Sequence, residues 1–188
     1  GVTVIPVSHH NLLDESTLYP EECTIENTKE VTALLEAYGV PVYLSGHLHL
    51  QRIKKHTSNL NTPGGYGIRE IVTSPLPMAP CQYSILNWQT DGSLSYHTKK
   101  VDIAGWAQRY GEEDENLLNF DAYADQFLVD VISKQAFKAL QSASKDIKEE
   151  MARLYADMNR DYCSGTKIDV AKIRKSEAYQ YWIRYSGN

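Results

Sequence analysis

Four histidines stand in two short clusters, each directly after an apolar run. His47 and His49 flank one leucine after Gly46 in the stretch VYLSGHLHLQ, and His9 and His10 close the stretch VTVIPVSHH. On an extended segment, residues i and i+2 point to the same face, about 7 Å apart. Imidazoles so placed can converge on one metal ion or on two adjacent ones, and imidazole suits Zn, Fe, Mn or Ni. Because Gly46 has no Cβ, it permits a sharp turn and a close approach of a ligand to the backbone.

The elements around the two clusters are predicted to bring them together. Val2–Val7 is a short continuous run of mainly Val and Ile, which predicts a strand buried on both faces. Val40–Leu44 predicts a second strand, with Pro41 at its start. With a helix between them, the two strands form a βαβ unit and lie parallel. Both histidine clusters then fall at carboxyl ends of neighbouring strands, where open α/β sheets bind their ligands.

The intervening helix is predicted from apolar spacing and from signals at both ends. Asn27, with Glu30 three residues later, matches a capping arrangement, and Gly39 follows the last periodic residue. The apolar positions i, i+3, i+4 and i+7 are Val31, Leu34, Leu35 and Tyr38.

Beyond the second cluster, the pattern changes from strands to helices. Strands are predicted over 50–57, 68–74 and 82–101, joined by the loops NTPGGYG and TSPLPMAP, with a hairpin turn at Thr90–Ser93. From Gly105 onward the apolar spacing is helical, and one of the helices is predicted over Val170–Tyr185. We therefore expect a mixed α/β part over residues 1–103 and an all-α part over residues 104–188.

Composition and charge argue against several classes of protein. The net charge is −5, and the basic stretches at Arg52–His56 and Lys172–Lys175 are short, so no nucleic-acid-binding patch is predicted. No apolar run is long enough to span a membrane. The first ten residues have no basic start or cleavage site, so they predict no signal peptide, and their abrupt apolar start suggests that the chain begins inside a domain. A disulfide framework or a zinc ribbon is not indicated, because the cysteines are few and widely spaced: Cys23, Cys81 and Cys163.

The remaining histidines and motifs favour no other chemistry. His56 and His97 lie in polar strands, where we expect surface residues, and Ser8 has no acid partner arranged as in a hydrolase triad. The sequence GGYG lacks the lysine of a phosphate-binding loop.

The two histidine clusters together resemble a known family. GHLH after an apolar strand, with an upstream strand ending in SHH, is similar to the second half of the catalytic domain of calcineurin-like metallophosphoesterases. In that family a strand ending in His, a helix and a strand ending in GHxH follow one another. Gly46 to His49 match GHxH in full, and His9 matches the upstream histidine. Asn11-Leu12-Leu13 departs from the family, in which a proline often follows the histidine.

The resemblance implies an αββα sandwich around two divalent or trivalent ions, Mn, Fe or Zn. The implied reaction is hydrolysis of a phosphomonoester or phosphodiester by a hydroxide that the metals activate. His9 and His47 would ligate one ion and His49 the other, whereas His10 would contact the substrate or lie in the outer shell. The family's first-half motifs DxH, GDxxD and GNH do not occur in the sequence. The chain then corresponds to the C-terminal half of the catalytic domain with a helical extension, and we expect it to be inactive without the missing N-terminal half.

Two other hypotheses stay open at this point. The HxH pair with a third histidine fits a mononuclear His₃ zinc hydrolase. Alternatively, the chain is a non-catalytic helical interaction module on a degenerate scaffold. A metallo-β-lactamase site is excluded, because HLHLQR lacks the run HxHxDH.

Overall fold

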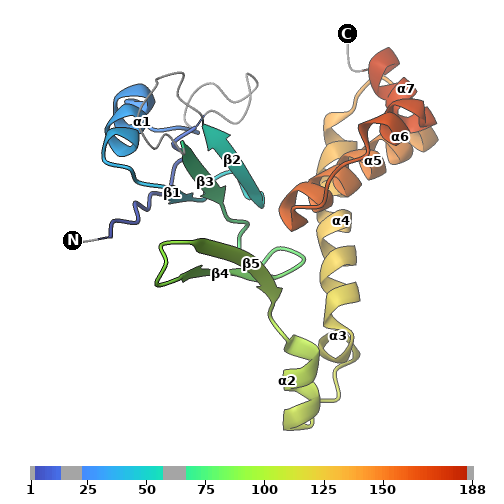
Figure 1. The fold of residues 1–188 in the computed structure, drawn as a ribbon. Coiled ribbons are helices and arrows are strands. Elements are labelled where there is room, and N and C mark those ends of the chain that lie inside the picture. The colour runs from blue at the N-terminus through green and yellow to red at the C-terminus, as the bar shows by residue number, and fades with distance from the viewer. Residues whose placement is uncertain (1–2, 14–22, 57–66, 186–188) are drawn as a thin grey trace. The chain divides into compact units, whose positions relative to one another are not determined.

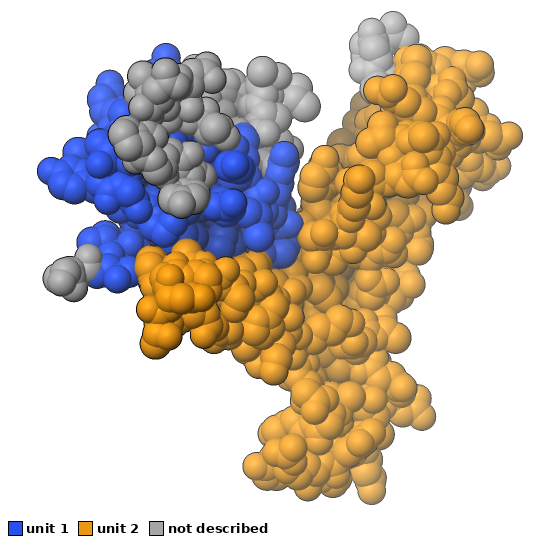
Figure 2. All heavy atoms as spheres, in the orientation of Figure 1, with its two compact units in different colours: residues 1–75 blue, residues 76–188 orange. Residues whose placement is uncertain are grey.

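The chain folds into two compact units, which Figure 2 distinguishes by colour. The first unit comprises residues 1–75 and the second residues 76–188. The computed structural model describes residues 3–13, 23–56 and 67–185. It confirms the predicted fold class, a mixed α+β region followed by helices. The division at 75/76 assigns the segment 82–101 to the second unit, whereas the boundary predicted at 103/104 assigns it to the first part.

The first unit is built on a three-stranded sheet beside one helix (Figure 1). Its order is β1-β3-β2, with β1 parallel to β3 and β2 antiparallel to β3. Ile71 in the central strand pairs with Leu44 on one side and with Ile53 on the other. The predicted strands are thus present with shorter bounds, and the loop NTPGGYG falls outside the described residues except for its last glycine. The elements are α1 (Thr28–Ala37), β1 (Val42–Ser45), β2 (Arg52–His56) and β3 (Ile68–Val72).

The predicted buried strand at Val2–Val7 is wrong in burial and regularity but right in direction. Val4 and Val7 are 53% and 71% exposed, so this segment is not a core strand. Its one bridge joins Val7 to Leu44 in parallel orientation. Leu44 N–H donates to Pro6 O, and Ser8 N–H donates to Leu44 O, each at 3.0 Å. Pro6 has no N–H to donate, which limits how far this ladder can extend.

Helix α1 forms where predicted but buries only part of its apolar face. Val31 and Leu35 pack against the core of the first unit, whereas Leu34 and Tyr38 are 56% and 80% exposed. Gly39 follows the helix with a φ of +67°, a conformation that favours glycine. The predicted side-chain cap is wrong, because Asn27 makes no capping hydrogen bond. One buried core cluster consists of Leu12, Leu13, Tyr43 and Ile68.

The second unit begins with the loop 76–81 and a β-hairpin. The antiparallel strands are β4 (Gln82–Trp88) and β5 (Leu94–Lys100), which confirms the hairpin predicted within residues 82–101. The turn lies where the sequence predicted it, with Gly92 at a φ of +84° and Asp91 Oδ1 accepting from Ser93 N–H.

Six helices are described after the hairpin (Figure 1). Arg160 near the end of α5 lies 3.6 Å from Asp125 near the start of α4, so these two long helices run antiparallel. The helix predicted over Val170–Tyr185 is interrupted at Ser176, whose extended backbone separates α6 from α7. None of the helices in the described part of the chain has the length and apolarity to cross a membrane. Their bounds are α2 (Ile103–Tyr110), α3 (Glu115–Leu118), α4 (Phe120–Ala139), α5 (Lys145–Ser164), α6 (Val170–Lys175) and α7 (Glu177–Tyr185).

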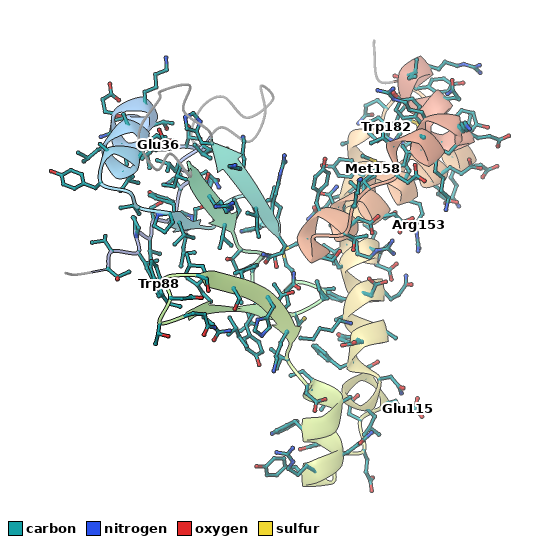
Figure 3. All side chains as sticks on the ribbon, viewed as in Figure 1. Glu36, Trp88, Glu115, Arg153, Met158 and Trp182 are labelled. Carbon is teal, nitrogen blue, oxygen red and sulfur yellow. The ribbon has the colours of Figure 1, made fainter. Side chains whose placement is uncertain are left out.

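The last helix is fixed to the long helical pair by a tryptophan. Trp182, labelled in Figure 3, extends from α7, and its indole N–H donates to Met151 O of α5 at 2.9 Å. Its ring centroid lies 6.1 Å from that of Tyr155, also on α5. Leu128 of α4 and Cys163 of α5 form the buried centre of the unit together with Ala79.

Candidate functional site

Three of the four predicted histidines come together in the first unit. The ring centroids of His9 and His47 lie 4.9 Å apart, those of His10 and His47 4.4 Å, and those of His9 and His10 5.1 Å. The closest atoms are His47 Nδ1 and His9 Nε2, at 3.0 Å. His9 and His47 are 38 residues apart in the sequence. The prediction that the two histidine clusters would lie close together is therefore confirmed for these three rings.

A strained turn presents His47 to this cluster. Leu48 N–H donates to Gly46 O at 2.7 Å, and the residue between them, His47, has a φ of +63°. A hydrogen bond from residue i+2 to residue i around a positive φ defines the rare, strained form of the γ-turn. His49 also lies in the left-handed region, with a φ of +55°. The predicted extended HxH segment is wrong, because β1 already ends at Ser45.

The left-handed conformations fall on the histidines and not on the glycine before them. A Cβ added at Gly46 would make only an ordinary contact with His9 O, at 3.8 Å. Gly46 instead contributes its backbone, because its N–H donates to His9 O at 3.1 Å and ties the two histidine segments together. The sharp turn that the sequence assigned to Gly46 is thus made one residue later, at His47.

The site is open to solvent, and the described residues do not form a complete ligand set. His9, His10 and His49 are exposed, and His47 is half-buried. Among residues 3–13, 23–56 and 67–185, no group of three or more His, Cys, Asp and Glu side chains is arranged to hold a metal ion. What the described residues offer is a pair of imidazole nitrogens at 3.0 Å. Two nitrogens at about 2.1 Å from one ion and at right angles to each other would also be about 3.0 Å apart, so the pair fits one ion.

Behind the histidines lies a buried carboxylate that the sequence did not reveal as part of the site. Glu70 of β3 is 0% exposed and accepts hydrogen bonds from Leu12 N–H at 2.6 Å and from Leu13 N–H at 2.7 Å. Ser45 Oγ donates to the same carboxylate at 2.6 Å, and Asn11 Nδ2 donates at 3.3 Å. The signal in the sequence was an acidic residue within the strand stretch IREIV.

A hydroxyl pair fixes the backbone between His9 and its neighbours. The Tyr43 hydroxyl donates to Ser8 Oγ at 2.8 Å, and Ser8 Oγ in turn donates to the carbonyl oxygen of His10. Ser8 therefore links the Tyr43 side chain to the backbone of His10.

The two histidines expected on the surface lie there. His56 has a 44% exposed side chain, and its Nε2 lies 4.0 Å from Oε1 of Glu36 on α1, which is labelled in Figure 3. His97 is exposed on β5 in the second unit.

The helical part of the chain is similar to a known domain. Residues 102–188 match the family model of the C-terminal domain of cyclic nucleotide phosphodiesterase. No curated protein matches the chain. The matched region comprises α2 to α7 and is phosphodiesterase-related, but it does not include the histidines. The resemblance to calcineurin-like metallophosphoesterases, which depends on those histidines, stays a prediction.

Proposed function

We propose that the chain contributes part of the active site of a metal-dependent phosphoesterase, with His9 and His47 as ligands of one ion and His49 as a ligand of a second. The observation that carries this proposal is the separation of 3.0 Å between His47 Nδ1 and His9 Nε2. Two nitrogens that each lie about 2.1 Å from one ion are about 3.0 to 3.4 Å apart, so the pair is suitable for an ion such as Mn, Fe or Zn.

The similarity of residues 102–188 to the C-terminal domain of cyclic nucleotide phosphodiesterase supports the reaction class. Cleavage of a phosphoester is compatible with that domain, and a pair of imidazoles is suitable for the ions that such cleavage uses. When bound, two such ions would polarise the phosphoryl oxygens and supply a nucleophile from water.

The chain's own residues have defined roles in this proposal. The 3.0 Å contact between His9 and His47 requires one ring nitrogen to donate and the other to accept. Binding of an ion to both nitrogens therefore requires the donating ring to carry its proton on its other nitrogen or to lose it. The ring of His10, 4.4 Å from that of His47, is placed to contact a phosphoryl oxygen of the substrate or a group of the outer shell.

The site needs further ligands, because the described residues offer no group of three or more side chains arranged to hold an ion. We propose that the N-terminal half of the catalytic domain, with the acidic and Asn ligands of the resembled family, completes the site. The 188-residue chain alone is then expected to bind Mn²⁺ weakly and to hydrolyse nothing.

The test combines metal binding with an activity assay. The chain is titrated with Mn²⁺, and its hydrolysis of bis(p-nitrophenyl) phosphate is measured with Mn²⁺ present. His9→Ala and His47→Ala should each weaken Mn²⁺ binding, whereas His97→Ala, an exposed histidine of the second unit, should not. Mn²⁺ binding that neither substitution changes would overturn the metal site. Robust turnover that His47→Ala abolishes would overturn the partial site, and one tightly held Zn²⁺ per chain would favour the mononuclear alternative.

A further inference from the structure

One carboxylate holds both segments that carry the paired histidines. Glu70 accepts from the backbone N–H groups of Leu12 and Leu13, which follow His9 and His10, and from the hydroxyl of Ser45, which precedes His47. The three distances are 2.6 Å, 2.7 Å and 2.6 Å, which are typical of hydrogen bonds to a charged acceptor. Glu70 itself lies on β3, between the two segments in space and far from both in sequence.

The packing around Glu70 shows that these hydrogen bonds are needed. Its side chain is 0% exposed, and a buried carboxylate is tolerated only where hydrogen bonds replace its water. Asn11, also 0% exposed, links the same groups, since its Nδ2 lies 3.0 Å from Ser45 Oγ and 3.3 Å from Glu70 Oε1. Neither segment can move away from the other without breaking a buried hydrogen bond.

The turn at His47 is a second indication that these hydrogen bonds hold the histidine segments in place. A residue with a φ of +63° adopts that conformation only where its surroundings impose it. Ser45, two residues before His47, is held through its hydroxyl by Glu70 and through its carbonyl by Thr73 N–H at 2.9 Å. These contacts fix the start of the turn, and the Gly46 N–H bond to His9 O fixes its partner segment.

We infer that Glu70 is the positioning residue of the histidine site, which sets the separation of His9 Nε2 from His47 Nδ1 without touching either ring. In so far as the pair binds an ion, this inference rests on the proposed function. Outer-shell groups that orient ligands typically change metal affinity about 10- to 100-fold when they are removed.

Glu70→Gln is the most discriminating substitution because it keeps the size and shape of the side chain. Whichever way the amide is turned, its NH₂ group faces at least one of the donors that the carboxylate now accepts. Ser45→Ala is the milder variant, which removes one hydroxyl and leaves three donors to Glu70. Ile71→Val is the matched control, since Ile71 is 3% exposed on the same strand and its loss of a methyl group leaves the Glu70 contacts intact.

Two measurements on the 188-residue chain and its variants decide the inference. The first is the ¹⁵N spectrum of the histidine side chains without metal, which reports the His9–His47 contact directly. The second is the affinity for Mn²⁺. We expect Glu70→Gln to shift the imidazole signals of both histidines and to weaken Mn²⁺ binding about 10-fold or more. Ser45→Ala should act in the same direction with a smaller effect, and Ile71→Val should leave both readouts unchanged.

The outcomes separate this inference from the proposed function. Unchanged imidazole signals in folded Glu70→Gln and Ser45→Ala would overturn the positioning role, and so would equal shifts in Ile71→Val. If Glu70→Gln does not fold, as shown by circular dichroism, Ser45→Ala decides in the same way. If the unmodified chain binds no Mn²⁺ through His9 and His47, the metal proposal fails, whereas the metal-free spectra still test Glu70.

Discussion

The positive φ at His47 predicts which of two substitutions at this position, glycine or alanine, gives the more stable protein. His47→Gly and His47→Ala both delete the imidazole, so they lose the same contacts and differ only in the Cβ atom. At a φ of +63°, a Cβ costs about 1–2 kcal/mol through its contact with the carbonyl. Glycine in turn lowers the stability by about 0.4–1 kcal/mol, because it increases the conformational entropy of the unfolded chain. The glycine variant should therefore be more stable than the alanine variant by roughly 0.5–1 kcal/mol.

His10 provides the matched control for this comparison. It belongs to the same cluster, but its φ is not in the left-handed region. At such a position alanine is the more stable residue, by about 0.4–1 kcal/mol. The order of stability of the Gly and Ala variants should consequently be reversed between positions 47 and 10.

Amide hydrogen exchange is the appropriate assay. The tryptophans, Trp88, Trp106 and Trp182, all lie in the second unit, so their fluorescence does not report on the turn. The amides of Leu44 and Thr73 are hydrogen-bonded within the first unit and are suitable probes of its opening. A difference of 0.5–1 kcal/mol changes their protection about two- to fivefold. If His47→Ala is as well protected as His47→Gly, the left-handed turn is refuted.

The remaining predictions concern the second unit, where urea unfolding followed by tryptophan fluorescence is informative. Arg160 lies 3.2 Å from Asp157 and 3.6 Å from Asp125. Burial lowers the pKa of Arg160, but these two carboxylates together with Asp161 raise it overall. Arg160→Met should destabilise the unit by about 1–2 kcal/mol, and high salt should reduce this difference in stability. Burial raises the pKa of the Cys163 thiol above 9.0, so the stability that the neutral thiol provides is present below pH 9 and is lost as the pH rises through the folded-state pKa. The urea midpoint should accordingly fall more steeply above pH 9 in the parent chain than in Cys163→Ala, and parallel pH profiles would contradict this. A Cβ at Gly105 would overlap the Asp102 carboxylate that caps α2, so Gly105→Ala should cost about 1 kcal/mol, whereas Ala104→Gly tests a neighbouring position without that overlap.

Periodicity predicted the elements well, because local patterns decide where helices and strands form. The hairpin turn at Thr90–Ser93 and the glycine after α1 were recognised from residues whose preferred conformations match the structure. The prediction of burial failed at a segment whose burial depends on tertiary contacts. The run at Val2–Val7 has the composition of a core strand, yet Val7 is 71% exposed and makes a single bridge. No single-sequence pattern distinguishes such an edge segment from a buried strand.

The sequence predicted that the two histidine clusters would lie close together, but it did not predict the conformation of their backbone. The histidines were recognised as candidate metal ligands because of their residue type and their positions directly after apolar runs. Their backbone conformation was not recognised, since a positive φ at His47 and at His49 is imposed by surrounding hydrogen bonds rather than by the residue type. Glu70 was missed for a similar reason, because a single acidic residue in a strand acquires meaning only when its four donors are known.

The two lines of support for a phosphoesterase lie in different units of the chain, and this decides how they should be tested. The similarity to a phosphodiesterase domain belongs to residues 102–188, and the imidazole pair belongs to the first unit. Substitutions at His9 or His47 therefore test the chemistry without testing the similarity. If those substitutions leave metal binding unchanged, the helical unit keeps its relationship to a phosphodiesterase, and the hypothesis of an interaction module on a degenerate scaffold gains support. If they abolish it, His9 and His47 hold the ion, and the search for the missing ligands becomes the next step.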